Sequence, residues 1–392
     1  MKNSIDTQKI IEQFCLREDL STYDPYDIWK TPFGFHIKNL FNHNSYTGFL
    51  PAGILTLFDT FVNNRFRIFY SQQEYPIVRA FAALSLLNLY CKSGQEKHID
   101  FVKKHLRWLV NHSCRGYSGY CWGLSFNYAV SSRFTYGKNT PLSTVTPYVL
   151  EAFAKYSQVT QDTQFNDIIG SIYDFFEKDI VTIEESDKHL ITSYGPMRDR
   201  IVINAVSYAM YSYSLLLPYV PLQKKEYVKD KIRKLYAYIH ENQRDNGSWL
   251  YSPLGKSFID CFHSCIVLKN IVKTDKMVQL NDCAKIVKKG YDCIKENLLD
   301  NHFWLFRRFA LKNKPSLVRF DLYDNAEMIN LGMLLGDNLL VGKLSDSINR
   351  YFCCGRDIYS QIDILGIRRN KNMLRWAVMP YVYALSERIG LK

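Results

Sequence analysis

The chain has 392 residues, of which 47% are hydrophobic and 15% aromatic, so it can bury a large core. Its formal net charge is +12, but the basic residues are dispersed and form no arm or tail, which argues against a nucleic-acid partner. The start MKNSIDTQKIIEQF has no apolar signal segment, and no stretch approaches the ~20 apolar residues of a membrane span. We therefore expect a cytoplasmic protein whose ten scattered cysteines are reduced thiols.

Apolar residues recur at helical spacing along most of the chain, between short polar or Gly/Pro breaks. The predicted helices span residues 5–18, 51–63, 75–94, 96–110, 143–157, 162–179, 200–217, 223–242, 257–272, 277–298, 322–336, 343–354 and 373–389. Richly apolar helices alternate with amphipathic ones, which is typical of α-hairpins with a buried inner helix and a water-facing outer helix.

This alternation predicts an all-α fold, an (α/α)6 toroid of six hairpins. A superhelical solenoid is the competing fold, but no sequence motif repeats along the chain. We expect a single domain over residues 1–392, in which 1–50 form an N-terminal helix and an extended arm packed on the barrel. In such a toroid the loops leading into the inner helices converge on one end. Site residues should therefore lie just before the apolar helices.

The first candidate segment is the turn 22-TYDPYDIW-29. Pro25 fixes its own backbone and disfavours a helix at the residue before it. The turn presents Tyr23, Asp24, Tyr26 and Asp27. These side chains either cap the turn and dock the N-terminal arm or line a sugar-sized cleft.

Two further candidates come from the middle of the chain. The segment 116-GYSGYCWGLSFNY-128 is a loop rich in glycine and aromatic residues, and it packs over either its own core or a ligand ring. Trp122 and the following Arg133 are the best ligand contacts there. Asn204 lies inside an apolar helix, where it either bonds a loop carbonyl or points into the cavity.

Asp260 and His263 open the apolar helix at 257–272 and share one of its faces. They form either a structural pair or the start of a catalytic site. Upstream, 243-QRDNGSW-249 resembles the Q…G-x-W element of terpene cyclases, in which the Trp and Gln tie helices together. Cys261 and Cys265 face away from the imidazole, and no second Cys/His cluster exists, so we predict no metal and no cofactor.

The last candidates precede the final helices. In 318-VRFDLYDNAEMINL-331, Asp321 and Asp324 are either helix caps or carboxylates of the kind that glycoside chemistry needs. Arg375 and Trp376 begin the last apolar helix.

Taken together, these segments resemble a family of bacterial capsule, O-antigen and exopolysaccharide biosynthesis proteins that are similar to six-hairpin glycosidases. The shared motifs are 23-YDPYD-27, 119-GYCWGLSFNY-128, 140-TPLSTV-145, 193-SYGP-196 with Asn204, 247-GSW-249, 259-IDCFHS-264, 321-DLYDNAE-327 and 375-RW-376. Two positions depart from the family pattern, since Asn127 replaces an Asp and Tyr323 replaces a His.

The first hypothesis is a glycan-active enzyme. A hydrolase would use Asp260 with Asp24, Asp321 or Asp324, beside an aromatic wall of Tyr26, Trp122 and Trp249. A lyase or uronate epimerase would instead use His263 or a tyrosine as base, with Arg133 or Arg375 neutralising the uronate carboxylate. The predicted catalytic residues are Asp260, His263, Asp321 and Asp24, and the predicted substrate-binding residues are Tyr23, Tyr26, Asp27, Trp122, Asn127, Arg133, Asn204, Trp249, Asp324, Arg375 and Trp376.

The second hypothesis is a non-catalytic glycan-binding or assembly factor that serves a glycosyltransferase. A terpene-cyclase-like toroid ranks third, because the chain lacks an aspartate-rich diphosphate motif. The expected partner is an oligo- or polysaccharide. Acidic glycans and lipid-linked glycans are both candidates for it. The resemblance implies work at the inner face of the membrane, within a glycosyltransferase or membrane-associated synthesis complex.

Overall fold

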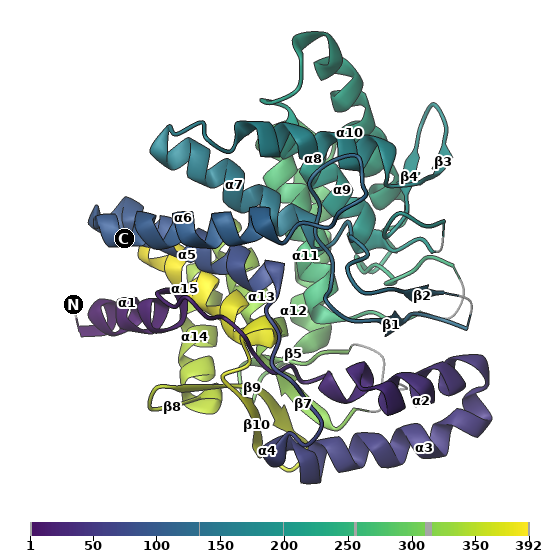
Figure 1. Ribbon diagram of the computed structural model, residues 1–392, viewed down its shortest axis with the longest axis vertical. Helices are drawn as coiled ribbons and strands as arrows, with labels where there is room; N and C mark the ends of the chain where they lie inside the picture. Colours follow the sequence, from purple (N-terminus) through teal and green to yellow (C-terminus); the bar gives the residue numbers. More distant parts are fainter. Residues whose placement is uncertain (1, 133, 199, 255–256, 310–315, 391–392) are drawn as a thin grey trace.

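The computed structural model describes residues 2–132, 134–198, 200–254, 257–309 and 316–390. Two concentric layers of helices form the predicted (α/α)6 toroid (Figure 1). The inner layer consists of α5 (Pro76–Ser93), α7 (Thr146–Thr160), α9 (Ile203–Leu216), α11 (Cys261–Asp275), α13 (Leu322–Leu334) and α15 (Met379–Gly390). The outer layer consists of α6 (Glu96–Asn111), α8 (Asn166–Lys178), α10 (Lys225–Glu241), α12 (Cys283–Leu298), α14 (Asn338–Phe352) and α1 (Lys2–Cys15).

The distribution of apolar residues explains the two layers. In α5 every residue from Val78 to Leu89 is buried, because the helix is covered on all sides by neighbouring helices. In α8 the buried residues recur every three or four positions, at Ile169, Ile172, Tyr173 and Phe176. That spacing forms a single apolar stripe, so the opposite face of an outer helix contacts water.

The ring closes between the last inner helix and the first, since α15 packs against both α5 and α13. Helix α1 lies outside them, against α15 and α5. His105 of α6 fastens α1, because its Nε2–H donates to the Cys15 carbonyl at 2.9 Å while its Nδ1 accepts from Arg79 at 3.0 Å.

Short antiparallel strands occupy the connections that lead from outer into inner helices. The strands are β1 (Tyr128–Ala129), β2 (Thr135–Tyr136), β3 (Thr182–Glu185), β4 (Leu190–Thr192), β5 (Leu299–Asp300), β6 (Leu305–Phe306), β7 (Val318–Asp321), β8 (Cys353–Cys354), β9 (Asp357–Asp363) and β10 (Arg368–Lys371). The largest sheet has the order β10-β9-β7, with β8 also paired to β9. It places Asp321 opposite Gln361. In Figure 1 both termini lie at the left, whereas β1 to β4 lie at the right.

The N-terminal arm between α1 and α5 is more helical than the expected extended arm. It contains η1 (Asp27–Lys30), α2 (Pro32–His43), α3 (Ser45–Leu57), η2 (Phe58–Asn63) and α4 (Asn64–Phe66). Thr31 caps α2, which starts with a proline, and Asn44 caps α3, so each helix has a local start signal. None of the described helices combines the length and the apolar content needed to cross a bilayer.

Candidate functional site

The N-terminal ends of α11, α13 and α15 bring three of the predicted segments together. Asp260 caps α11 and Asp321 caps α13. Trp376 lies in η4 (Leu374–Val378), directly before α15, and its indole Nε1 donates to Asp321 at 3.0 Å. The ring of Phe262 lies edge-on to Trp376, with the ring centres 5.5 Å apart. The residues at the start of three inner helices therefore contact one another.

Asp260 and His263 form an oriented carboxylate–imidazole pair. The Nδ1–H of His263 donates to the Asp260 carboxylate at 2.7 Å, which fixes Nε2 as the nitrogen with a free lone pair in the neutral ring. Nε2 has no hydrogen-bond partner among the described residues, and the side chain is 19% exposed. The rings of Phe262 and Tyr251 lie 3.8 Å and 4.6 Å from the imidazole. This geometry suits a base that accepts a proton from a bound molecule.

Arg308 is the central cation of the site. Its Nη1 donates to the Tyr26 hydroxyl at 2.7 Å and to Asp321 at 3.3 Å. Its guanidinium lies over the ring of Trp376, 5.2 Å from the ring centre. Burial alone would lower the pKa of Arg308, but Tyr26 and Asp321 raise it, so the charge persists at every working pH. The backbone joins the same cluster, since the Arg308 carbonyl accepts from the amide of Cys261 at 2.9 Å.

Asp321 has no free oxygen for chemistry. It accepts from the amide of Tyr323 at 2.9 Å and from the Gln361 side chain at 3.0 Å, in addition to Trp376 and Arg308. Asp321 is fully buried and accepts hydrogen bonds from four donors. It therefore fixes the positions of the groups that carry these donors. Asp321 is therefore better placed to orient the site than to accept a proton.

Asp24 is held in the same way, by an ion pair with Arg375 and a 2.9 Å hydrogen bond from the amide of Tyr26. Burial opposes its ionisation, but the charges of Arg375 and Lys30 lower its pKa to about 2. Burial lowers the pKa of Lys30 itself, and its ammonium is 3.6 Å from Asp24, so Arg375 is the main partner.

Asp324 is a fourth carboxyl, fully buried beneath the site. One of its oxygens accepts from the Phe262 amide at 2.9 Å, and the other has no partner among the described residues. Burial, and then the charge of Asp321, raise its pKa well above the usual range, which favours the protonated, neutral form of this carboxyl. Glu327, three residues further along α13, forms an ion pair with Lys269.

Arg200 and three tyrosines form an aromatic cluster beside the imidazole. The Arg200 guanidinium lies over the rings of Tyr194 and Tyr251, at 4.6 Å and 5.8 Å, and donates to the Tyr128 hydroxyl at 3.1 Å. Tyr251 in turn contacts His263. Arg200 and Arg308 were not among the residues predicted from the sequence. Both stand in connections that lead into inner helices, which is the one signal that could have selected them.

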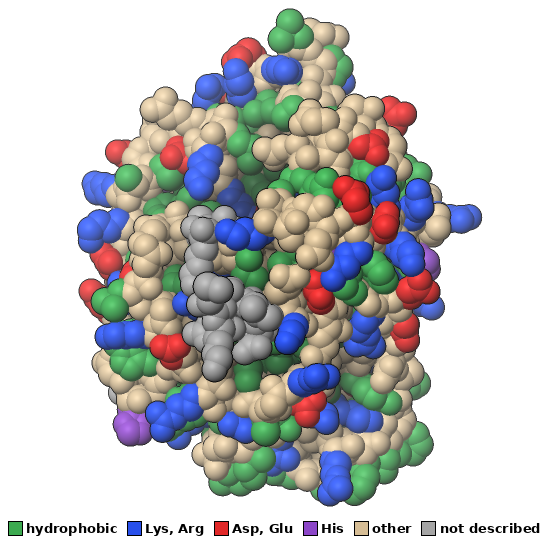
Figure 2. All heavy atoms as spheres, turned by 90° about the vertical axis from the view of Figure 1, so that its left-hand side faces the viewer, with side chains coloured by type: hydrophobic (Ala, Val, Ile, Leu, Met, Phe, Trp, Pro, Cys, Tyr) green, Lys and Arg blue, Asp and Glu red, His purple; other side chains and the backbone are tan. Residues whose placement is uncertain are grey.

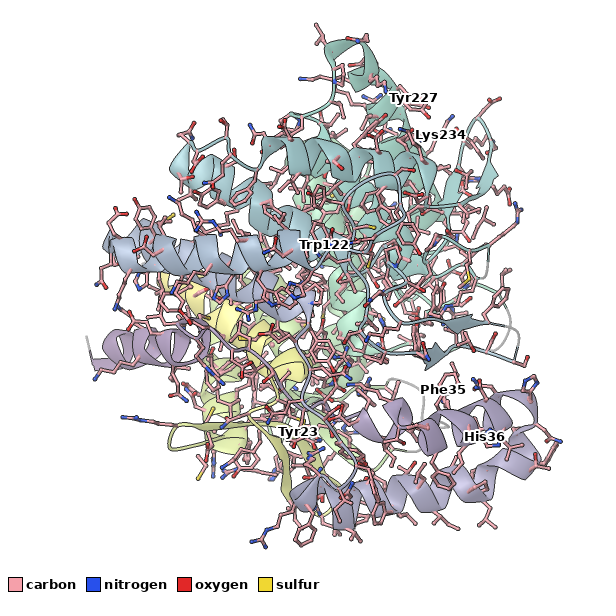
Figure 3. All side chains as sticks on the ribbon, in the orientation of Figure 1. Tyr23, Phe35, His36, Trp122, Tyr227 and Lys234 are labelled. Atoms are coloured by element: carbon pink, nitrogen blue, oxygen red, sulfur yellow. The ribbon has the colours of Figure 1, made fainter. Side chains whose placement is uncertain are left out.

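Two tryptophans predicted to contact a sugar belong to the core instead. Trp122 is fully buried against Phe153 and donates to the Leu109 carbonyl at 2.8 Å. Trp249 is buried too, and its Nε1 donates to the Ile239 carbonyl at 2.8 Å. The predicted ligand role of both indoles is therefore wrong. Figure 3 shows Trp122 well separated from Tyr23.

The tie predicted from 243-QRDNGSW-249 is present in the structure. The Gln243 side chain donates to the carbonyl of Ile286 in α12, while Trp249 bonds α10 through Ile239. These bonds fasten two outer helices to each other. The segment has the structural role that its short resemblance implied.

Several other predicted binding residues have local structural roles. Asn127 is exposed and accepts from the Lys138 amide at 2.7 Å. Asp27 accepts from the Asp24 amide and from Lys30, both at 2.8 Å. Tyr23 lies beside the guanidinium of Arg67 in the arm.

Two predicted residues remain. Asn204 is buried in the first turn of α9, and its side-chain oxygen has no partner among the described residues, so it keeps a free acceptor. Arg133 lies outside the described residues.

No three His, Cys, Asp or Glu side chains in the described ranges converge as metal ligands. The Sγ atoms of Cys261 and Cys265 are 3.9 Å apart, while His263 is turned toward Asp260.

Comparison with known proteins supports the fold. Neither a family model nor a curated sequence matches the chain. Among solved structures, a cellobiose 2-epimerase from Bacillus thermoamylovorans superimposes with a TM-score of 0.62 at 13% identity, over 80% of this chain and 88% of that one. A GH76 α-mannanase from Bacteroides thetaiotaomicron gives 0.61 at 10% identity, over 99% and 94%. A polysaccharide lyase gives 0.56 at 11% identity, over 92% and 98%. These similarities show that the chain has the six-hairpin toroid fold of such proteins.

Proposed function

We propose that this protein is a carbohydrate-active enzyme that removes a proton from a sugar carbon, with His263 as the base. The observation that carries the proposal is the free Nε2 of an imidazole whose Nδ1–H is bound to Asp260. The C–H bond breaks, its proton goes to Nε2, and the electron pair moves onto the adjacent carbonyl or carboxyl group. An epimer forms when water protonates the opposite face of the carbon and Nε2 releases its proton to solvent. A lyase product forms when the β-substituent leaves instead and takes up the proton that Nε2 holds.

Arg308 supports this chemistry, because its buried positive charge lies beside the same aromatic rings as the imidazole. A cation near the reacting carbonyl or carboxyl stabilises the negative charge that develops there. The rings of Phe262 and Tyr251 contact the imidazole and give the base an aromatic surrounding.

Hydrolysis fits the site less well, since it requires one carboxyl as acid and another as base or nucleophile. Asp24 and Asp321 are each saturated by cations and hydrogen bonds, and Asp324 is sealed beneath the site. Asp260 already accepts the imidazole N–H. The fold alone does not favour one of these reactions, since the similar structures include an epimerase, a lyase and a GH76 α-mannanase.

We also propose that the substrate is an oligo- or polysaccharide intermediate of capsule, O-antigen or exopolysaccharide synthesis. The support is the resemblance carried by Asp260, His263, Asp321 and Arg375, together with the contacts among the segments that contain them. In this proposal the protein works on the cytoplasmic side of the membrane, beside the glycosyltransferases that build the chain.

The test is exchange of solvent deuterium into a panel of neutral and uronic-acid oligosaccharides, followed by NMR. His263→Ala should lower the exchange rate by about 10²–10⁴-fold. Asp260→Asn should lower it by about tenfold or more, because the amide no longer fixes the tautomer. The surface variant His36→Ala is the matched control and should exchange at the wild-type rate.

Full exchange by His263→Ala would refute the assigned base. A wild-type protein that binds the oligosaccharides without exchange or cleavage would favour the non-catalytic glycan-binding factor.

A further inference from the structure

Helix α3 presents an unusual apolar surface to solvent. Its sequence SYTGFLPAGILTL contains no charged residue, and Leu50 and Ile54 are 68% and 60% exposed. Phe49 and Leu57 of the same helix are exposed too. Green side chains gather along the lower edge of Figure 2, at the height where Figure 1 places α3 and α4. Exposed apolar patches of this extent mark binding surfaces.

These side chains form one wall of a groove of about 930 Å³. The opposite wall is built by Leu317, Val318 and Ile364, from β7 and the turn after β9. The side chains just named are apolar, while Asp59, Asp363 and Arg369 add charges elsewhere in the lining. The apolar stretch between the two walls therefore fits a hydrocarbon chain better than a sugar.

The groove runs directly into the candidate site. Tyr26, Arg308 and Gln361 line it. In the site, Arg308 donates to Tyr26 and to Asp321, and Gln361 donates to Asp321. One molecule can therefore occupy both places only if it is apolar along most of its length and polar, with hydrogen-bonding groups, at one end. The cation at the junction also suits a negatively charged linking group.

We propose that this groove binds the hydrocarbon chain of a lipid-linked saccharide, whose sugar end reaches His263. The inference rests on the proposed function for the identity of the sugar end, and it adds the class of substrate. A concave groove with two apolar walls and a polar end favours an amphiphile over a second copy of the chain, which would need a broader self-complementary face.

The test measures binding of octyl, decyl and dodecyl maltoside to the purified chain by calorimetry, below their critical micelle concentrations. Each added methylene that enters the groove should tighten binding about two- to fourfold. Leu50→Asp and Ile54→Asp should remove this dependence on chain length, and both positions are exposed enough for the variants to fold. Leu222→Asp is the matched control, because Leu222 is 80% exposed on η3 (Leu222–Lys224), away from the groove, and should leave the dependence unchanged.

Equal affinity for all three maltosides would overturn the proposal. So would a wild-type dimer that Ile54→Asp converts to a monomer, or binding to phosphatidylcholine vesicles that Ile54→Asp abolishes while the maltosides show no chain-length dependence.

His263→Ala separates this inference from the proposed function, since it should lose deuterium exchange but keep the dependence on chain length. If the wild type shows chain-length dependence without any exchange, the groove stands and the proton-transfer function fails. If exchange occurs without chain-length dependence, only the groove assignment fails.

Discussion

Asp24 and Arg375 come from opposite ends of the chain and form a buried ion pair at the edge of the candidate site. The pair connects the turn before η1 to the π-helical start of the last inner helix. Its role is to hold Tyr26 and Trp376 together, whose rings lie edge-to-face at 5.1 Å. A residue that the sequence suggested as a catalyst thus acts through its neighbours.

The Asp24→Asn variant should lose about 3 kcal/mol of unfolding free energy at neutral pH, because it leaves Arg375 without its buried partner. The folded-state pKa of Asp24, about 2, lies below its unfolded value near 3.9, so the wild-type pair contributes above about pH 4 and is lost as the pH falls through 2. Urea unfolding at pH 7, 4 and 3 should show the difference between wild type and variant shrinking with acid. A difference that is constant with pH would contradict the ion-pair account.

The positions of Asp260, His263 and Asp321 at the starts of apolar helices could be predicted from the sequence, and in the toroid these helix starts lie together. Prediction from the sequence failed where the signal is composition alone. The local sequence of a tryptophan in a glycine-rich loop is the same whether the side chain contacts a ligand or packs in the core of the protein, as Trp122 does. Arg308 was missed because a single cation in a connection between helices belongs to no periodic pattern and to no motif with a characteristic spacing.

At the scale of elements, the contact between α1 and α6 depends on a neutral histidine. His105 is fully buried, donates from Nε2 to the Cys15 carbonyl and accepts at Nδ1 from Arg79. A protonated ring could not accept from Arg79. Burial lowers the pKa of His105 to about 4, which keeps the ring neutral above that pH.

We expect this contact to make the protein acid-sensitive. The unfolded state binds a proton at His105 below about pH 6.5, whereas the folded state binds it only below about 4, so stability falls as the pH drops through that window, by about 3 kcal/mol in total. His105→Gln should flatten the pH dependence of the unfolding free energy between 6.5 and 4. An unchanged pH profile in the variant would assign the acid sensitivity to other groups.

Element boundaries followed from local signals where these exist. The helix expected at 257–272 begins at Cys261, because Asp260 caps it, and the helix expected from 343 begins at Asn338, where Asp337 caps it. Helix α2 was not predicted, since its short, mixed sequence PFGFHIKNLFNH shows little periodicity. The small sheet was missed because its strands are short and rich in Asp and Arg.

For the whole molecule, the alternation of apolar and amphipathic helices was sufficient to predict the toroid. Ring closure itself depends on long-range packing that no local pattern shows. Phe81 of α5 packs against Tyr148 of α7 and Tyr383 of α15, so it joins three neighbouring inner helices.

The Phe81→Ala variant should lose about 3–5 kcal/mol of unfolding free energy, because the cavity it leaves is shared by three helices that cannot all move inward. Phe33→Ala, at an exposed position of α2, is the control and should change stability by less than about 0.5 kcal/mol. Denaturant titrations of both variants measure the two values. Equal effects would mean that the ring tolerates a gap at its closing contact.

The closing contact between α5 and α15 also sets an order on biosynthesis. We expect α5 to emerge from the ribosome with an apolar face whose last neighbour in the ring, α15, begins only at Met379. The ring of the nascent chain therefore stays open at this contact until α15 has been synthesised. We expect a chaperone that shields α5 until α15 leaves the exit tunnel to have the greatest effect on yield.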